Sequence, residues 1–247
     1  MASGMNIRTL GDATAACVER LARVRRELEA DPARAREADR RAEEFDDGYN
    51  AVLAESRYGS IAPPKYRDIP RRLDTHGSPA RQRFYAELMR AVELVKTGRQ
   101  VTVLVLGKSG IGKTYFACWL MRELLNTWRP PALCSVPCRW SCGYTTGVQL
   151  SARYKNADGY NARERREDIA REMNLFNFLV VDEIGRRQTQ WEQDALFDIA
   201  DMRTGSTMLI SNMELAEFSE YAGAGVIDRL NPTKCLIATD GCESWRV

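Results

Sequence analysis

Apolar runs and amphipathic segments alternate along residues 78–239 of this chain. Five short runs predict strands at 101–106, 142–146, 178–183, 207–211 and 235–238. Apolar residues recur at helical spacing between and before them, in the segments 79–97, 115–125, 150–174 and 191–203. Strands that alternate with helices predict an α/β fold, in which helices cover both faces of a mostly parallel sheet.

The N-terminal segment, residues 12–47, is rich in Arg, Glu and Ala and predicts two helices. The first helix carries an apolar stripe formed by Cys17, Leu21, Val24 and Leu28. The second begins after Asp31, has Pro32 in its first turn and contains few apolar residues. The segment is either a solvated helical hairpin or an arm that docks its stripe on a partner, and the sequence favours neither.

Residues 58–77 contain three prolines and several turn-forming residues, which predict an irregular linker. We therefore expect three parts in this chain. They are a small helical N-terminal domain that binds a partner (1–57), the linker (58–77) and the α/β domain (78–247).

The loop after the first strand reads GKSGIGKT and fits the P-loop pattern G-x-x-x-x-G-K-[ST] at every defined position. Its glycines let backbone N–H groups turn toward phosphate oxygens, and the N-terminus of the following helix adds partial positive charge. In this motif Lys113 reaches the β- and γ-phosphates and Thr114 is a ligand of Mg²⁺. The predicted nucleotide-binding residues are Gly107, Lys108, Ser109, Gly110, Ile111, Gly112, Lys113 and Thr114.

The strand 178–183 ends in a Walker B pattern, in which four apolar residues precede Asp182 and Glu183. We expect Asp182 to hold Mg²⁺, directly or through water, and Glu183 to orient and polarise the water that attacks the γ-phosphate. Asn212 follows the next strand and can hold that water or the γ-phosphate. These residues predict an ATPase that uses ATP and Mg²⁺.

The segment 150–174 is basic, although acidic residues partly offset its charge. Its basic residues are Arg153, Lys155, Arg163, Arg165, Arg166 and Arg171. A mixed run of this kind is commonly a solvated face. We expect this run also to contact the phosphates of single-stranded DNA.

Cys134, Cys138 and Cys142 recur at every fourth residue, which is reminiscent of a zinc site. No fourth ligand is obvious, however, and prolines interrupt the run, so we expect a surface loop that leads into a strand.

The composition is ordinary for a globular protein, with 44% hydrophobic residues, 28% charged residues and a net charge of +2. No apolar run approaches the roughly 18 residues of a membrane span, and the N-terminus does not have the pattern of a signal peptide. Seven cysteines in such a chain favour reduced thiols and a cytoplasmic protein. We expect no membrane partner.

Taken in order, the motifs resemble those of the DnaC/DnaI family of AAA+ replicative-helicase loaders, and especially its DnaC branch. GKSGIGKT, FLVVDEIG, LISNM, GVIDRL and ESWR follow one another at closely similar spacing, and the preceding IAPPKYRD is also similar. The resemblance implies Walker A for Lys113 and Thr114, Walker B for Asp182 and Glu183, sensor one for Asn212, the arginine finger for Arg229 and sensor two for Arg246.

The family implies a nucleotide-dependent loader whose N-terminal domain binds a hexameric DnaB-type helicase. Its AAA+ domains associate with one another in a spiral or ring around single-stranded DNA. The N-terminal segment of this chain matches only in helical character, and residues 130–142 resemble an insertion. Three alternatives remain: an IstB-type transposition ATPase, which shares the core, a nucleotide-sensing adaptor with little ATP turnover, and a small-molecule P-loop kinase.

Overall fold

The computed structural model describes residues 32–70, 73, 78–127, 129, 138–160 and 162–238, with side chains from residue 47 onward except at 232 and 238. Contacts divide the chain into two compact units, Met1–Val52 and Leu53–Val247. The described part of the first unit belongs to helix α2 (Pro32–Ile61), which begins at the predicted residue. The predicted first helix, Cys134 and Arg246 lie outside the described residues.

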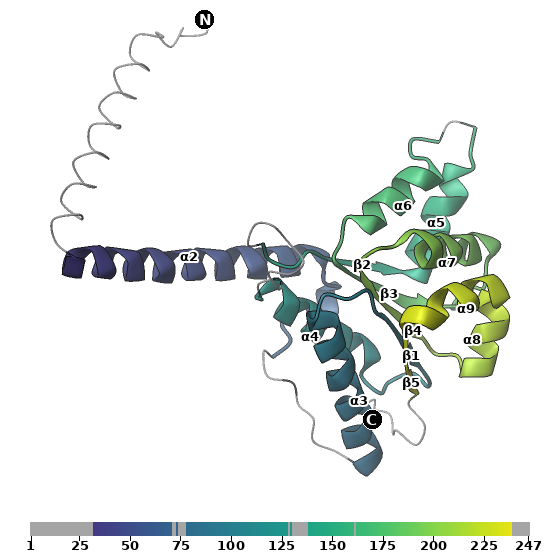
Figure 1. The fold of residues 1–247 in the computed structure, drawn as a ribbon. Coiled ribbons are helices and arrows are strands. Elements are labelled where there is room, and N and C mark those ends of the chain that lie inside the picture. The colour runs from purple at the N-terminus through teal and green to yellow at the C-terminus, as the bar shows by residue number, and fades with distance from the viewer. Residues whose placement is uncertain are drawn as a thin grey trace, which may run out of the picture. The chain divides into compact units, whose positions relative to one another are not determined.

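Five parallel strands form the central sheet of the second unit (Figure 1). They are β1 (Thr102–Leu106), β2 (Cys142–Thr146), β3 (Phe178–Ile184), β4 (Ser206–Ser211) and β5 (Lys234–Ala238), in the order β2-β3-β4-β1-β5. The structure confirms all five predicted strands to within one residue at each end. Because all pairings are parallel, the loops that follow β1, β3 and β4 meet at one edge of the sheet.

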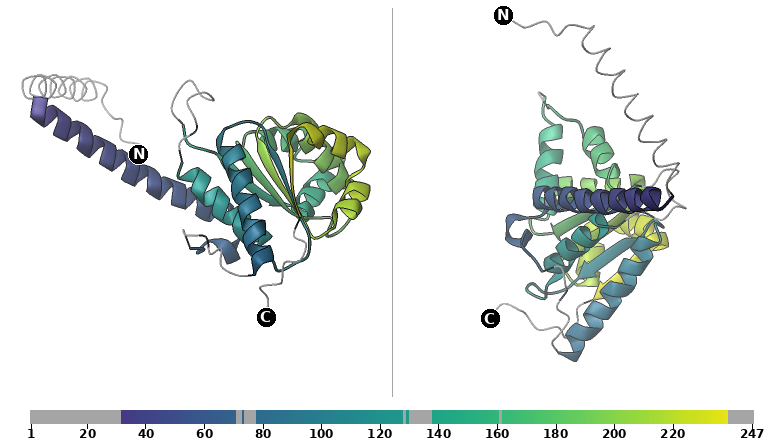
Figure 2. Two further views of the ribbon diagram at one scale, coloured as in Figure 1. Left: turned by 60° about the horizontal axis from the view of Figure 1, so that its bottom comes forward. Right: turned by 90° about the vertical axis from the view of Figure 1, so that its left-hand side faces the viewer.

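Helices cover both faces of this sheet (Figures 1 and 2). One face packs against α3 (Pro79–Lys96) and α4 (Lys113–Leu125). The other face packs against α5 (Gly147–Ala157), α6 (Arg166–Asn174), α7 (Gln190–Met202), α8 (Leu215–Ala222) and α9 (Ala224–Leu230). The predicted α/β fold, a parallel sheet flanked by helices, is therefore confirmed.

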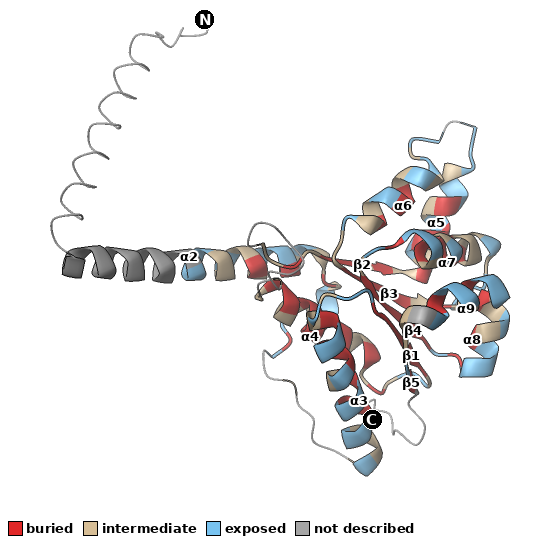
Figure 3. Ribbon diagram, in the orientation of Figure 1, coloured by how far each residue is buried: buried red, intermediate tan, exposed pale blue. Residues whose placement is uncertain are grey.

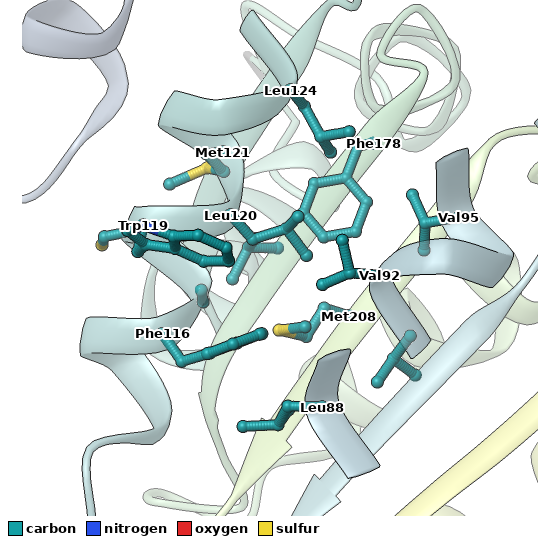
Figure 4. Packing of buried hydrophobic residues seen from close by; sticks show 14 of the residues in the cluster. Leu88, Val92, Val95, Phe116, Trp119, Leu120, Met121, Leu124, Phe178 and Met208 are labelled. Carbon is teal, nitrogen blue, oxygen red and sulfur yellow. The ribbon is translucent and has the colours of Figure 1, made fainter. Parts of the chain in front are cut away.

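Successive side chains along each strand point to opposite faces of the sheet, so the buried residues form two cores. Val103 and Val105 of β1 point into the first core, which contains α3 and α4, whereas Leu104 and Leu106 point into the second. The central strands β1, β3 and β4 are buried on both sides, and the helices are buried along their inner faces (Figure 3). Figure 4 shows side chains of the first core from α3, α4, β3 and β4: Leu88, Val92, Val95, Phe116, Trp119, Leu120, Met121, Leu124, Phe178 and Met208.

The predicted helix at 150–174 is two helices in the structure. Helix α5 begins earlier, at Gly147, because Thr146 and Gln149 form a reciprocal capping box at its N-terminus. It ends at Ala157, ahead of Asp158 and Gly159, and α6 begins at Arg166. Asp and Gly favour turns over a continued helix, so the prediction from apolar periodicity alone, which gave one helix, was wrong at this point.

The linker predicted at 58–77 also differs from the structure. Residues 58–61 are the last turn of α2, and Tyr58, Ala62 and Ile69 are buried in the first core. The guanidinium of Arg122 on α4 holds this segment: Nε and Nη2 donate to the Glu55 carboxylate, and Nη1 donates to the carbonyl of Ile69. Much of the segment therefore packs as part of the second unit. The three-part domain division itself remains a prediction.

Candidate nucleotide site

The P-loop connects β1 to α4 and adopts a conformation that its glycines permit. Gly110 and Gly112 have φ angles of 91° and 95°, in the left-handed region that residues with a Cβ rarely adopt. Gly112 is the N-cap of α4, which starts at Lys113. The loop therefore ends at a helix N-terminus, where unpaired backbone N–H groups and the helix dipole favour an anion such as phosphate.

Lys113 lies in this loop with 7% of its surface exposed. Its Nζ donates to the carbonyl oxygens of Gly107 and Lys108, at 2.5 and 2.8 Å, and to Oδ1 of Asn212 at 2.9 Å. Asn212 comes directly after β4, which pairs with β1, so the sheet order brings the two residues together. The structure thus joins the predicted P-loop lysine to the residue predicted to act as a sensor.

The Asp182 carboxylate lies beside the start of α4 and is 2% exposed. Its Oδ2 accepts hydrogen bonds from Thr114 Oγ1 at 2.7 Å and from Tyr144 Oη at 2.9 Å. Its Oδ1 accepts from the backbone N–H of Glu183 at 2.7 Å. The two residues predicted to hold Mg²⁺ are therefore in direct contact.

Tyr144 is a site residue that no sequence motif marked. It lies on β2, the strand next to β3, and burial together with the negative charge of Asp182 raises the pKa of its phenol. The phenol therefore keeps its proton at neutral pH and acts as the donor in its bond to Asp182.

Glu183 follows Asp182 with a backbone φ of 55°, which is unusual for a residue with a side chain. Its Oε2 accepts a hydrogen bond from Nη1 of Arg186 at 2.7 Å. The carboxylate predicted to polarise water is thus in an ion pair with Arg186. To contact a water molecule in the pocket, Glu183 must either break this ion pair or bind the water while it remains paired.

The P-loop residues, the two Walker B carboxylates and Asn212 surround a pocket of about 270 Å³. Its lining comprises Lys65, Tyr66, Ser109, Gly110, Gly112, Lys113, Thr114, Tyr115, Asp182, Glu183, Ile210, Ser211 and Asn212. No nucleotide-binding motif marks Lys65 and Tyr66, which lie within the predicted linker. Tyr58 Oη donates to the carbonyl of Tyr66 at 2.5 Å, which helps to hold that segment beside the pocket.

The donor set fits a nucleotide with Mg²⁺. Glycine N–H groups, a helix N-terminus and the Lys113 ammonium suit phosphate oxygens, whereas the Thr114 hydroxyl and the Asp182 carboxylate suit a hard cation that prefers oxygen ligands. Among the described residues, there is no cluster of three or more His, Cys, Asp or Glu side chains that could hold a metal ion.

Arg229 lies elsewhere, on α9, and does not line this pocket. Its Nε donates to Oδ1 of Asp201 at 2.6 Å, its Nη1 donates to the carbonyl of Gly225 at 3.0 Å, and its Cζ is 4.2 Å from the ring centroid of Phe197. The side chain is 38% exposed. Arg229 is thus held against α7, on the same chain but apart from the residues that surround Lys113.

The six basic residues predicted to bind DNA lie on α5, on α6 and between these helices, and several have partners within the chain. Arg153 pairs with Glu164 and Glu172, Arg166 with Asp158 and Asp194, and Arg171 with Asp168. The ammonium of Lys155 lies 5.4 Å from the ring centroid of Trp191. Arg163 and Arg165 are exposed. Three arginines of the predicted set are therefore already paired with carboxylates.

The cysteine run is only partly described. Cys142 is buried on β2, and burial raises the pKa of its thiol, while Cys138 is partly buried; neither forms a disulfide. In the parts of the chain that the structure describes, no helix is both long enough and apolar enough to cross a membrane.

Comparisons with known proteins give matches in structure. No protein-family model matches the sequence, and no curated protein matches it. The structure is similar to that of DnaI, with a TM-score of 0.54, 15% identity and coverage of 75% of this chain and 97% of DnaI. It is similar to the DnaC helicase loader, with a TM-score of 0.51, 13% identity and coverage of 71% of this chain and 99% of that chain.

A third similar structure is a proposed primosome component from Streptococcus pyogenes serotype M3. Its TM-score is 0.53 and its identity 19%, over 76% of this chain and 97% of the other. The neighbours thus include the DnaC and DnaI helicase loaders that the motifs resemble. At these identities the likeness shows the fold, and the chain shares with these proteins a parallel sheet flanked by helices.

Proposed function

We propose that this chain is an ATP-dependent loader that places a hexameric DnaB-type replicative helicase on single-stranded DNA. The observation that carries the proposal is the convergence of Lys113, Thr114, Asp182 and Asn212 around one pocket, in a fold shared with the DnaC helicase loader. The order of the motifs along the chain adds to this support.

In the proposed ATPase cycle, each side chain has a defined task. Lys113 exchanges its carbonyl partners for the β- and γ-phosphates of ATP, and Asn212 remains within its reach to contact the γ-phosphate or the attacking water. Mg²⁺, held by Thr114 and Asp182, supplies charge neutralisation at the phosphate oxygens. Glu183 accepts a hydrogen bond from the attacking water and so orients it.

We further propose that the active site is completed by a second copy of the chain in a spiral or ring. Arg229 is 38% exposed and does not line the pocket of its own chain, which suits a residue that acts on a neighbour. A guanidinium has a planar fork of donors that fits charge spread over phosphoryl oxygens. Its ion pair with Asp201 is on the surface, where such pairs contribute about 0–1 kcal/mol, so that pair by itself holds the side chain only weakly.

Single-stranded DNA is the second proposed ligand, and it would contact the region between α5 and α6. Arg163 and Arg165 are exposed there, and the side chain of Tyr160 is exposed as fully as in an extended chain. Exposed aromatic rings stack on bases, and exposed cations contact phosphates. Binding should weaken steeply with salt, with a slope that corresponds to few phosphates per subunit. An affinity that does not change with salt would contradict this contact.

A loading assay tests the main proposal. The host's replicative helicase is mixed with circular single-stranded DNA, ATP and this protein, and the helicase retained on the circle is measured. Wild-type protein should increase retention only when ATP is present, and the Lys113→Ala variant should not. If wild-type protein neither binds the helicase nor changes its retention, the loader proposal is wrong.

The ion pair between Glu183 and Arg186 favours a second candidate function, a nucleotide-sensing adaptor with little turnover. Multiple-turnover ATPase assays, with and without single-stranded DNA, separate the two functions. A loader that hydrolyses ATP should turn over repeatedly with DNA present, whereas an adaptor should bind ATP and release little phosphate under both conditions.

A further inference from the structure

Tyr144 reaches the candidate metal site from a neighbouring strand. In the register between β2 and β3, Tyr144 lies opposite Val180 and Thr146 lies opposite Asp182. Residues two apart on a strand point to the same face, so Tyr144 and Asp182 project from one side of the sheet. The long phenol side chain spans the offset between them and places Oη 2.9 Å from Oδ2 of Asp182.

The Asp182 carboxylate is consequently held by donors from three segments. The hydroxyl of Thr114, from the start of α4, shares Oδ2 with the Tyr144 phenol, and the backbone N–H of Glu183 holds Oδ1. An ionised carboxylate has about four acceptor positions, so three donors restrict its rotation and leave about one position open. Of these three donors, only the tyrosine comes from a segment that no nucleotide-binding motif covers.

We propose that Tyr144 is a positioning residue that orients Asp182 for the divalent cation bound with the nucleotide. The proposal rests on the nucleotide site proposed above. Groups that hydrogen-bond a metal ligand set its orientation, and their loss typically weakens metal binding by about 10- to 100-fold. Tyr144 acts through Asp182 and has no other task in the reaction.

A purely structural role is the competing explanation, because the Tyr144 ring packs against the first core. The variant Tyr144→Phe separates the two roles, since it keeps the ring and removes only the hydroxyl. Tyr154→Phe is a matched control. Tyr154 is a buried tyrosine whose Oη donates to Oδ2 of Asp198, also at 2.9 Å, and it does not line the nucleotide pocket.

The experiment measures binding rather than turnover. A fluorescent, non-hydrolysable ATP analogue is bound to the full chain, and Mg²⁺ is titrated from an EDTA-treated baseline. For Tyr144→Phe we expect the Mg²⁺ concentration at half-saturation to rise about 10-fold. Analogue affinity at saturating Mg²⁺ should remain within about twofold of wild type, and Tyr154→Phe should titrate as wild type does.

The possible outcomes distinguish this inference from the proposed function. If wild-type protein binds no analogue at any Mg²⁺ concentration, the nucleotide site itself is wrong and the inference falls with it. If wild-type protein binds with a clear Mg²⁺ dependence and Tyr144→Phe has the same midpoint, the positioning role alone is refuted. It is also refuted if Tyr154→Phe shifts the midpoint as far, because the effect is then a general loss of stability.

Discussion

Arg122 offers a direct test of whether the end of α2 and the segment after it are packed as part of the second unit. Its guanidinium donates to Glu55 with N–O distances of 2.8–3.1 Å, donates to the carbonyl of Ile69 at 2.5 Å and lies 5.5 Å from the ring centroid of Tyr58. Its side chain is 15% exposed, and that of Glu55 is 29% exposed. The variant Arg122→Met removes these polar contacts and keeps an unbranched apolar side chain in the same space.

The expected loss lies between two limits. Hydrogen bonds to charged groups contribute about 1.5–3 kcal/mol, whereas exposed ion pairs contribute about 0–1 kcal/mol. Arg122 is mostly buried, but Glu55 retains enough exposure to be rehydrated when its partner is lost, so we expect the free energy of unfolding to fall by about 2 kcal/mol. Nucleotide affinity should fall as well, because the same segment carries Lys65 and Tyr66 to the pocket.

Equilibrium unfolding in urea measures the first effect, and titration with a fluorescent nucleotide measures the second. Arg171→Met is the control, because Arg171 is 72% exposed and, among the described residues, its ion pair is with Asp168 on the same helix. The control should lose less than about 0.5 kcal/mol. If Arg122→Met loses no more than Arg171→Met, the segment does not depend on this contact and the reasoning is refuted.

Four further predictions concern the proposed reaction. Glu183→Gln should still bind ATP but lose hydrolysis, because an amide cannot polarise water; a turnover rate equal to that of wild type would remove Glu183 from the mechanism. Lys65→Gln should lower the affinity for ATP several-fold and the affinity for ADP less, because Lys65 lines the same pocket as the Walker B carboxylates. An equal effect on both nucleotides would place Lys65 away from the terminal phosphate. Arg229→Ala and Lys113→Ala, each nearly inactive alone, should recover part of the ATPase activity when mixed with DNA and helicase, since some mixed interfaces contain both intact residues. Failure to recover activity in assemblies of normal size would argue against a site shared between subunits. The ATPase activity of Asp201→Ala should be close to that of wild type if the pair with Arg229 is only a resting contact.

Much of the fold followed from local patterns in the sequence. Runs of four to six residues located all five strands to within one residue at each end, and the central strands β1, β3 and β4 are mostly apolar because both of their faces are buried. The P-loop was also readable, since its glycines are needed for φ angles that other residues rarely adopt. The Walker B aspartate could be located for a similar reason, as it directly follows one of these apolar runs.

Local patterns in the sequence did not predict contacts between distant segments. Periodicity joined α5 and α6 into one helix, and prolines made residues 58–77 resemble a linker, although Tyr58 and Ile69 are core residues. The partner of Arg229 is Asp201, which is 28 residues away in sequence, and no local pattern indicates that pairing.

The sequence by itself therefore determined the elements, their order and the residues of the two phosphate-site motifs, because each depends on a few consecutive residues and their backbone conformation. The tertiary structure decided what surrounds those motifs. It brought Lys65 and Tyr66 to the pocket and the Tyr144 phenol to Asp182. Those positions depend on strand order, register and the packing of segments far apart in sequence, and no single segment of the chain specifies them.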